Sequence, residues 1–263
     1  MNPFDFKKIL SFGSVEFIRY AVAAGVIWIF FYGIRRRHWL HRKIIQKFPQ
    51  GRDVRRELAF SAVTSLIYGA VGLATVLMIR QGWTHYYTHI DKYGWGWFCA
   101  SVVITIFLHD AYFYWTHRLM HHPRLFPWMH KAHHRSINPT PWAAYAFDPL
   151  EAVVQAAIFP LAVFLYPISP LAFLLFMLWQ LLFNVIGHAG FEIFPSWFLK
   201  SWIGKFLNTP TNHTMHHQYF RGNYGLYFNI WDRMMGTNHP DYEKRFHTVT
   251  TCERADVRIK EAA

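Results

Sequence analysis

The sequence predicts an all-α integral membrane protein with four or five transmembrane or hairpin helices. Apolar residue types make up 53% of the 263 residues and charged types only 16%, whereas soluble domains carry about a quarter charged residues. Aromatic residues reach 19%, which is typical of chains that meet the membrane–water interface. The net charge is +12, and the basic residues lie beside apolar runs. We therefore expect an anionic membrane surface, and not nucleic acid, to face them.

Four apolar runs account for the expected helices: 20–34, 58–79, 95–115 and 152–187. The second is uncharged and long enough to span a bilayer. The fourth would be about 54 Å long as one straight helix, but a hydrocarbon core is only about 30 Å thick. Pro167 and Pro170 lie in its middle and should break it. It is therefore expected to form a helical hairpin, with arms at about 151–166 and 171–187.

The distribution of Lys and Arg predicts the orientation. The connection 35–57 contains nine of these residues, and the loop 80–94 contains two. The first should be cytoplasmic and the second external. Counting spans from there returns 116–150 and everything after 187 to the cytoplasm. Both histidine-rich segments should then meet in a helical cap on the cytoplasmic side.

Three regions follow from this pattern. Residues 1–94 form N-terminal membrane helices with a basic connection, 95–241 form the main domain, and 242–263 form a polar C-terminal tail. The stretch 194–207 mixes aromatic residues with lysines, which predicts a helix lying on the membrane surface.

The 17 histidines are concentrated in a few motifs. An HxxxH pair is followed by two HxxHH motifs, and one further histidine ends the last apolar run. These nine residues are His117, His121, His130, His133, His134, His188, His213, His216 and His217. Positions i, i+3 and i+4 share one face of a helix, so each HxxHH motif should direct three imidazoles into one volume. Nine imidazoles are too many for one metal ion and suit two.

Ligand type alone leaves the metal open, because imidazole suits iron, zinc, copper and nickel. A lone histidine is more often a core or surface residue than a ligand. The repeated motif on one predicted side of the membrane nevertheless favours a metal site. The sequence has no HExxH motif, which argues against a zincin-type protease, and it lacks the Glu-x-x-His pattern of soluble di-iron bundles.

Three stretches, HRLMHHPRLFPWMHKAHH, PTPWAAYAF and NHTMHHQYFRGNYGLYFNIWDRMMGT, resemble the fatty acid hydroxylase superfamily, sterol desaturase branch, with most similarity to sterol C5-desaturases, the lathosterol oxidases. The resemblance covers about 108–237. It implies a non-heme centre of two iron ions held by the nine histidines, activation of O₂, and hydroxylation or desaturation of a sterol-like or fatty acyl lipid. Zinc could replace iron in the isolated protein.

Two positions depart from the family pattern. Members often have His where this chain has Asp148, and some hydroxylases have His at the position of Asn184, four residues before His188. The number of ligands at one metal therefore stays open.

Other residues are expected around the ligands. His109 and Asp110 form a polar pair inside an apolar run, and Asp110 could orient a ligand imidazole. The carboxylates of Asp110, Asp148, Glu151 and Asp232 could offset the charge of the metal ions. Candidates for lining the path of the lipid are Trp142, Tyr145 and Phe147.

Electrons are expected from an external donor, a ferredoxin or a cytochrome b5-like protein, because the chain has no GxGxxG dinucleotide motif. The basic connection could dock such a protein, although anionic lipid is the simpler partner. Two other functions compete with the oxygenase. One is a membrane zinc hydrolase and the other is a non-catalytic metal-binding membrane protein.

Overall fold

The computed structural model describes residues 6–252, which are helical with no β-strand. The α-helices are α1 (Phe6–Trp28), α2 (Arg36–Trp39), α3 (Gly51–Arg80), α4 (Gly94–Met120), α5 (Phe126–Met129), α6 (Lys131–His134), α7 (Pro149–Ala156), α8 (Ile158–Leu165), α9 (Pro170–Gly187), α10 (Pro210–Tyr219), α11 (Ile230–Met234) and α12 (Tyr242–Thr251). Short 3-10 turns follow α2 and α6, and the π-helix Ile29–Ile34 continues α1.

Four of these helices are long and apolar enough to cross a membrane: α1 with its π-helical extension, α3, α4 and α9. The predicted all-α membrane fold is therefore confirmed. The predicted hairpin is present, with α7 and α8 as one arm and α9 as the other. α9 is about 27 Å long at 1.5 Å per residue. The other arm breaks at Ala157, because Pro160 has no N–H to donate to the carbonyl of residue 156.

The first spanning helix begins earlier than its apolar run. α1 extends back to Phe6, and its charged residues Glu16 and Arg19 pair with each other at 3.0 Å. It crosses α3 at very short range, since a Cβ on Gly69 would lie 2.5 Å from the backbone nitrogen of Gly13. Small residues let membrane helices approach in this way.

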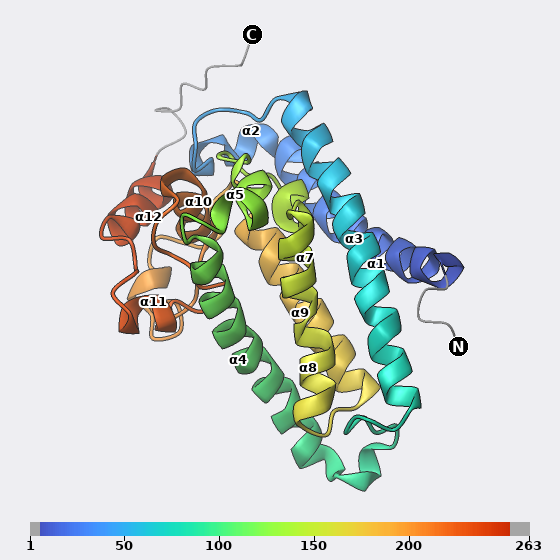
Figure 1. Cartoon of the computed structure of the whole chain (residues 1–263). Coiled ribbons are helices and arrows are strands. Elements are labelled where there is room, and N and C mark those ends of the chain that lie inside the picture. The colour runs from blue at the N-terminus through green and yellow to red at the C-terminus, as the bar shows by residue number, and fades with distance from the viewer. Residues whose placement is uncertain (1–5, 253–263) are drawn as a thin grey trace.

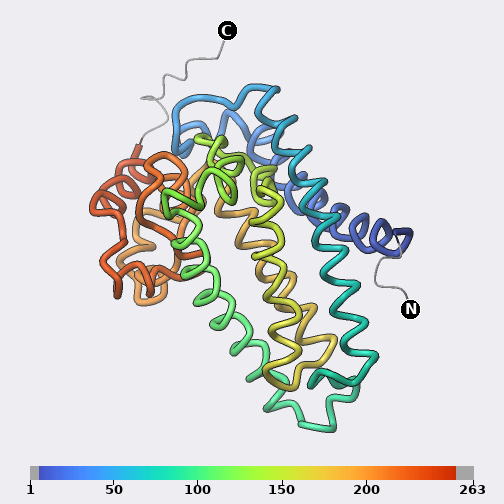
Figure 2. The backbone as a smooth tube through the Cα atoms, in the orientation of Figure 1, coloured from blue at the N-terminus to red at the C-terminus, as the bar shows by residue number. Residues whose placement is uncertain are grey.

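The remaining helices form a cap. α3, α4, α7–α8 and α9 run along the length of the molecule, and α5, α10 and α12 gather near one end, opposite the loop between α3 and α4 (Figure 1; Figure 2). All the histidine motifs lie at this capped end, as the span count predicted. That this end faces the cytoplasm stays a prediction.

The prediction of a surface helix over 194–207 is wrong. Only Phe198–Lys200 forms a short 3-10 turn, and the chain then folds back on itself. Gly204 packs on the Phe198 carbonyl with no room for a Cβ, and its N–H donates to the Ser201 hydroxyl at 3.0 Å. The exposed indole of Trp202 still gives this loop an apolar surface.

The C-terminal segment is described only as far as residue 252. Its helix α12 packs on α10, with Tyr242 and Phe246 buried against Met215. The rest of the predicted tail, 253–263, lies outside the described residues.

Candidate metal centre

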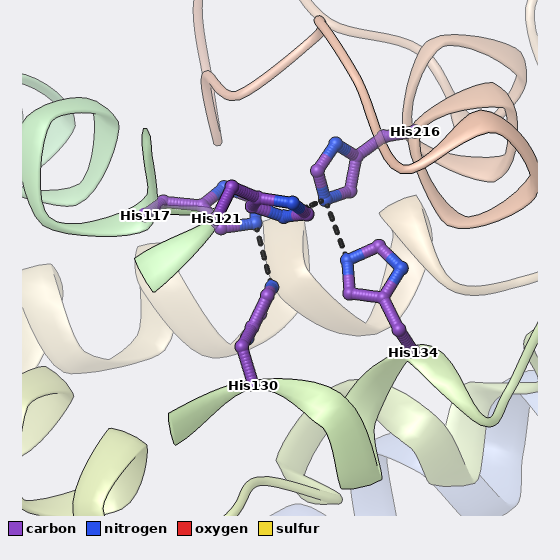
Figure 3. A group of neighbouring side chains, drawn as sticks. All are labelled: His117, His121, His130, His134 and His216. Carbon is purple, nitrogen blue, oxygen red and sulfur yellow. Dashed lines mark hydrogen bonds between the residues drawn. The ribbon is translucent and has the colours of Figure 1, made fainter. Parts of the chain in front are cut away.

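The nine predicted histidines come together at the capped end as two groups. The first group contains His117, His121, His130, His134 and His216 (Figure 3). The second contains His133, His188, His213 and His217. In each group the possible ligand nitrogens all lie within 4.8 Å of one another. Every member is buried except His121, which is half-buried.

The spacing of the imidazole nitrogens fits metal ions. In the first group, His117 Nε2 lies 2.9 Å from His130 Nε2 (Figure 3). In the second, His188 Nε2 lies 2.9 Å from His213 Nε2 and 3.2 Å from His217 Nε2. Neighbouring nitrogens bound to one metal at about 2.0–2.1 Å are about 2.9–3.4 Å apart in octahedral or tetrahedral geometry. The two groups therefore suit one ion each.

The opposite ring nitrogens are held by the protein backbone. His117 Nδ1 donates to the Tyr224 carbonyl at 2.8 Å, and His216 Nδ1 donates to the Gly222 carbonyl at 2.8 Å. A proton fixed on Nδ1 leaves the Nε2 lone pair free for a metal. These two carbonyls therefore set both the orientation and the tautomer of their histidines.

The loop that carries these carbonyls is held by Asp232. Its carboxylate accepts hydrogen bonds from the backbone N–H groups of Tyr224 and Gly225 and from the Thr237 hydroxyl, at 2.7–2.9 Å. Gly222 has φ +75°, and a Cβ there would lie 2.5 Å from the Thr237 carbonyl oxygen. Asp232 thus acts on the ligands through the loop and not by contact.

Each HxxHH motif divides its histidines between the two groups. His130 lies at the break between α5 and α6, with φ −147°, and belongs with His134 to the first group, whereas His133 belongs to the second. In α10, His216 joins the first group and its neighbour His217 the second. The expectation that each motif serves one volume is wrong, because both segments run between the two groups.

One carboxylate contacts a candidate ligand directly. Glu151 Oε1 lies 2.8 Å from His130 Nδ1, and both side chains are about 1% exposed. Asp148 is not in such a position, since it accepts the backbone N–H of Ala132 at 2.6 Å and so holds α6. Among the four acidic residues proposed to offset the metal charge, Glu151 is therefore the one placed to do so through a ligand.

The polar pair in α4 lies further from the ligands. Asp110 accepts the backbone N–H groups of Tyr227 and Phe228 at 2.9 and 3.1 Å. His109 Nδ1 is 2.7 Å from the Tyr227 hydroxyl. The pair therefore holds the loop before α11 against the spanning helix. Among the described hydrogen bonds, none joins Asp110 to a histidine of either group.

Asn184 supports its neighbour through its backbone. Its carbonyl accepts His188 Nδ1 at 2.7 Å, while its side-chain amide donates to the Ala144 carbonyl at 2.7 Å. The amide is thus used to hold the chain before Tyr145.

The three candidate lining residues lie at different distances from the site. The Phe147 ring is 5.2 Å from the His133 ring, so this residue borders the second group. Tyr145 stacks on Tyr20 at 4.8 Å and accepts a hydrogen bond from Gln180. Trp142 packs against Tyr20 and Trp28 of α1.

Two buried carboxylates that the sequence did not single out also position the site. Glu192 accepts the backbone N–H of Thr211 at 3.1 Å and so caps α10, and Glu57 accepts the Ser136 hydroxyl at 2.7 Å. Each has a sequence signal, since Glu192 is the one charged residue in the stretch 188–199 and Glu57 immediately precedes an uncharged run.

Lys43 behaves differently from the basic connection around it. It is fully buried, and its Nζ donates to Asn138 Oδ1 at 3.0 Å and to the Gly190 carbonyl at 3.2 Å. Burial lowers the pKa of Lys43 to about 7. This residue therefore ties the connection to the segment after His188 and does not face lipid headgroups.

The electrostatics of the groups favour metal binding. Burial lowers the pKa of His188 and His216 to about 4. Burial, with neighbouring imidazoles, lowers the pKa of His130, His134 and His217 well below the ordinary value. Neutral imidazoles are the form that binds metal.

Metal retention should therefore persist in mild acid. Because the pKa values of the folded protein lie below that of free histidine, protons should compete with metal only as the pH approaches about 4. Metal content after equilibration in chelator-free buffer should stay constant from neutral pH to about 5.5 and then fall. Loss with a midpoint near the ordinary histidine pKa would contradict this.

A cleft of about 800 Å³ reaches His121, the half-buried candidate ligand. His121 forms part of its wall, together with Phe126 of α5, the end of α10 with the loop that follows it, and the segment after α11. Arg221 and His239 also line it, so the cleft has a basic side. It is a direct route from the surface of the cap to the first histidine group.

The family model for fatty acid hydroxylase matches residues 102–237, which contain all nine histidines. The chain belongs to the fatty acid hydroxylase family. A Delta(7)-sterol 5(6)-desaturase of Gibberella zeae is 32% identical over 88% of this chain and 67% of its own length. Human lathosterol oxidase is 28% identical over 73% of this chain and 64% of its own length.

Membership of the fatty acid hydroxylase family confirms the resemblance seen in the histidine motifs. The chain spans about two-thirds of the length of these two relatives. No solved structure matches the chain.

Proposed function

We propose that this chain is a membrane-bound, O₂-dependent oxidoreductase that uses two iron ions to hydroxylate or desaturate a C–H bond of a sterol-like or fatty acyl lipid. The observation that supports this most is the presence of two buried histidine groups, one of five residues and one of four, at the end of apolar spanning helices. The names of the relatives favour a sterol-like substrate.

Iron bound at these histidines would supply activation of O₂ for cleavage of an unactivated C–H bond. The protein's own part is to keep the imidazoles neutral by burying them and to orient them through the Tyr224 and Gly222 carbonyls and the contact of Glu151 with His130. The apolar ring of Phe147 covers the second group on the membrane side. An external electron donor, a ferredoxin or a cytochrome b5-like protein, would dock over the cleft at His121, on the cytoplasmic side.

The runner-up function is a zinc hydrolase. The four-histidine group would suit a tetrahedral zinc ion, but five imidazoles in the other group exceed zinc's usual four ligands. This difference supports iron for the first group.

Metal content and oxygen dependence test the proposal together. The purified protein should contain about two iron ions per chain, as two groups of ligands imply. Expression in cells should give a lipid with one added oxygen atom or two fewer hydrogen atoms, and only in air. One zinc ion per chain with full turnover under anaerobic conditions would overturn it.

A further inference from the structure

A small cavity lies on the membrane side of the second histidine group. Its volume is about 10 Å³, and it is lined by Phe147, Asn184 and Gln155 among others. Phe147 contacts the His133 ring, and Asn184 accepts the Nδ1 proton of His188 through its carbonyl. An atom in this cavity would therefore lie immediately beneath the candidate metal ligands.

A larger cavity lies beside the small one. It has a volume of about 290 Å³ and lies among α1, α3, α8 and α9, and the contacting rings of Tyr68 and Phe159 line both cavities and separate them. Its walls are mainly apolar and belong largely to the membrane-spanning helices. A long apolar molecule in the larger cavity would thus bring one end close to the histidines once the rings of Tyr68 and Phe159 move aside.

The small cavity has one polar side chain with an unused donor. Gln155 is 4% exposed, and its Nε2 has no hydrogen-bond partner among the described residues. Gln180, which also lines the cavity, already donates to the Tyr145 hydroxyl at 3.1 Å. A buried amide N–H without a partner costs free energy, so such groups usually have a role or a missing partner.

The position of Gln155 relates it to the metal ligands. It lies on α7 one turn after Glu151, whose carboxylate contacts His130 at 2.8 Å. Residues i and i+4 lie on the same face of a helix, so both side chains point toward the site. The unused donor is therefore placed close to the reacting region.

We infer that Gln155 is a positioning residue: its side-chain amide donates a hydrogen bond to an oxygen of the lipid substrate, while the apolar body of the lipid occupies the 290 Å³ cavity. This rests on the proposed function and specifies its substrate. The substrate carries a hydroxyl at the end that reaches the metal centre. A sterol has this form, with one hydroxyl at the end of a rigid apolar body.

Binding of two probes tests the inference on the metal-loaded protein in lipid nanodiscs. Cholestanol carries the hydroxyl, and cholestane has the same body without it. Wild type should prefer cholestanol by about tenfold, and Gln155→Leu should reduce this preference to near one without weakening cholestane binding. Partition into the nanodisc is the same for each variant and cancels in the comparison.

Gln180→Leu is the matched control. It removes an amide from the same cavity, but one that is engaged with Tyr145, so the preference for cholestanol should remain. An unchanged preference in Gln155→Leu, or an equal loss in both variants, would overturn the inference.

A second measurement needs no variant. A sterol that keeps its hydroxyl and carries a small photoreactive group on a neighbouring ring carbon should label the α7 peptide that contains Gln155 in the wild-type protein. Labelling confined to other segments would overturn the inference even if Gln155→Leu fails to fold. A protein that oxidises sterols but fails these tests contradicts the inference alone, whereas one that neither binds nor oxidises sterols contradicts the proposed function.

Discussion

His216→Ala and His133→Ala are each expected to remove metal from one group and to abolish turnover. His216 Nε2 lies 3.2 Å from His121 Nε2 and 3.0 Å from His134 Nε2, so its loss opens the first group. His133 is in the second group. Activity should fall by more than about 100-fold, since even the outer partners of ligands contribute about 10–100-fold. Metal analysis of the purified variants, with turnover in membranes, measures both effects.

The exposed neighbour His122 provides the matched control. It follows His121 directly but is in neither group, so His122→Ala should keep full metal content and activity. Because the two groups share no histidine, each ligand variant should retain about one ion per chain. Wild-type metal content in His133→Ala or His216→Ala would remove that residue from the site.

Glu151→Leu is expected to weaken metal binding and activity by about 10–100-fold. The carboxyl group contacts His130 Nδ1 in a fully buried position, and a metal ion bound at the neutral imidazoles would favour its ionised, negatively charged form. Removing it loses both the orientation of His130 and this charge. The measurement is metal affinity by competition with a chelator, followed by turnover.

Glu151→Gln separates the two effects. The amide keeps the shape of the side chain and its contact with His130, so a loss that is smaller than in Glu151→Leu would assign the remainder to charge. Normal metal affinity in Glu151→Leu would show that the contact with His130 does not support the metal site.

Much of the fold could be predicted because lipid places strict demands on sequence. A spanning helix must be long and apolar, so the runs 58–79 and 95–115 identify α3 and α4 without any tertiary information. Pro167 and Pro170 likewise mark the turn of the hairpin. The stretch 194–207 was mispredicted because its composition suits a surface helix, whereas the packing of Gly204 on Phe198 turns the chain.

The candidate ligands were also identifiable, but their arrangement was not. Motif spacing describes one helix face, and that argument fails at His130, where the helix is broken. The division of His133 from His134, and of His216 from His217, depends on how α6 and α10 run between the two groups.

The sequence by itself determined the spanning helices, the nine histidines and the end of the molecule where they meet, because hydropathy and motif spacing are local properties. Only the tertiary structure decided which histidines share a group, that Glu151 contacts His130, and that Lys43 is buried in a connection that looked exposed. It also left the Nε2 donor of Gln155 without a hydrogen-bond partner beneath the site. These are contacts between distant segments, and such contacts have no periodic signal in the chain.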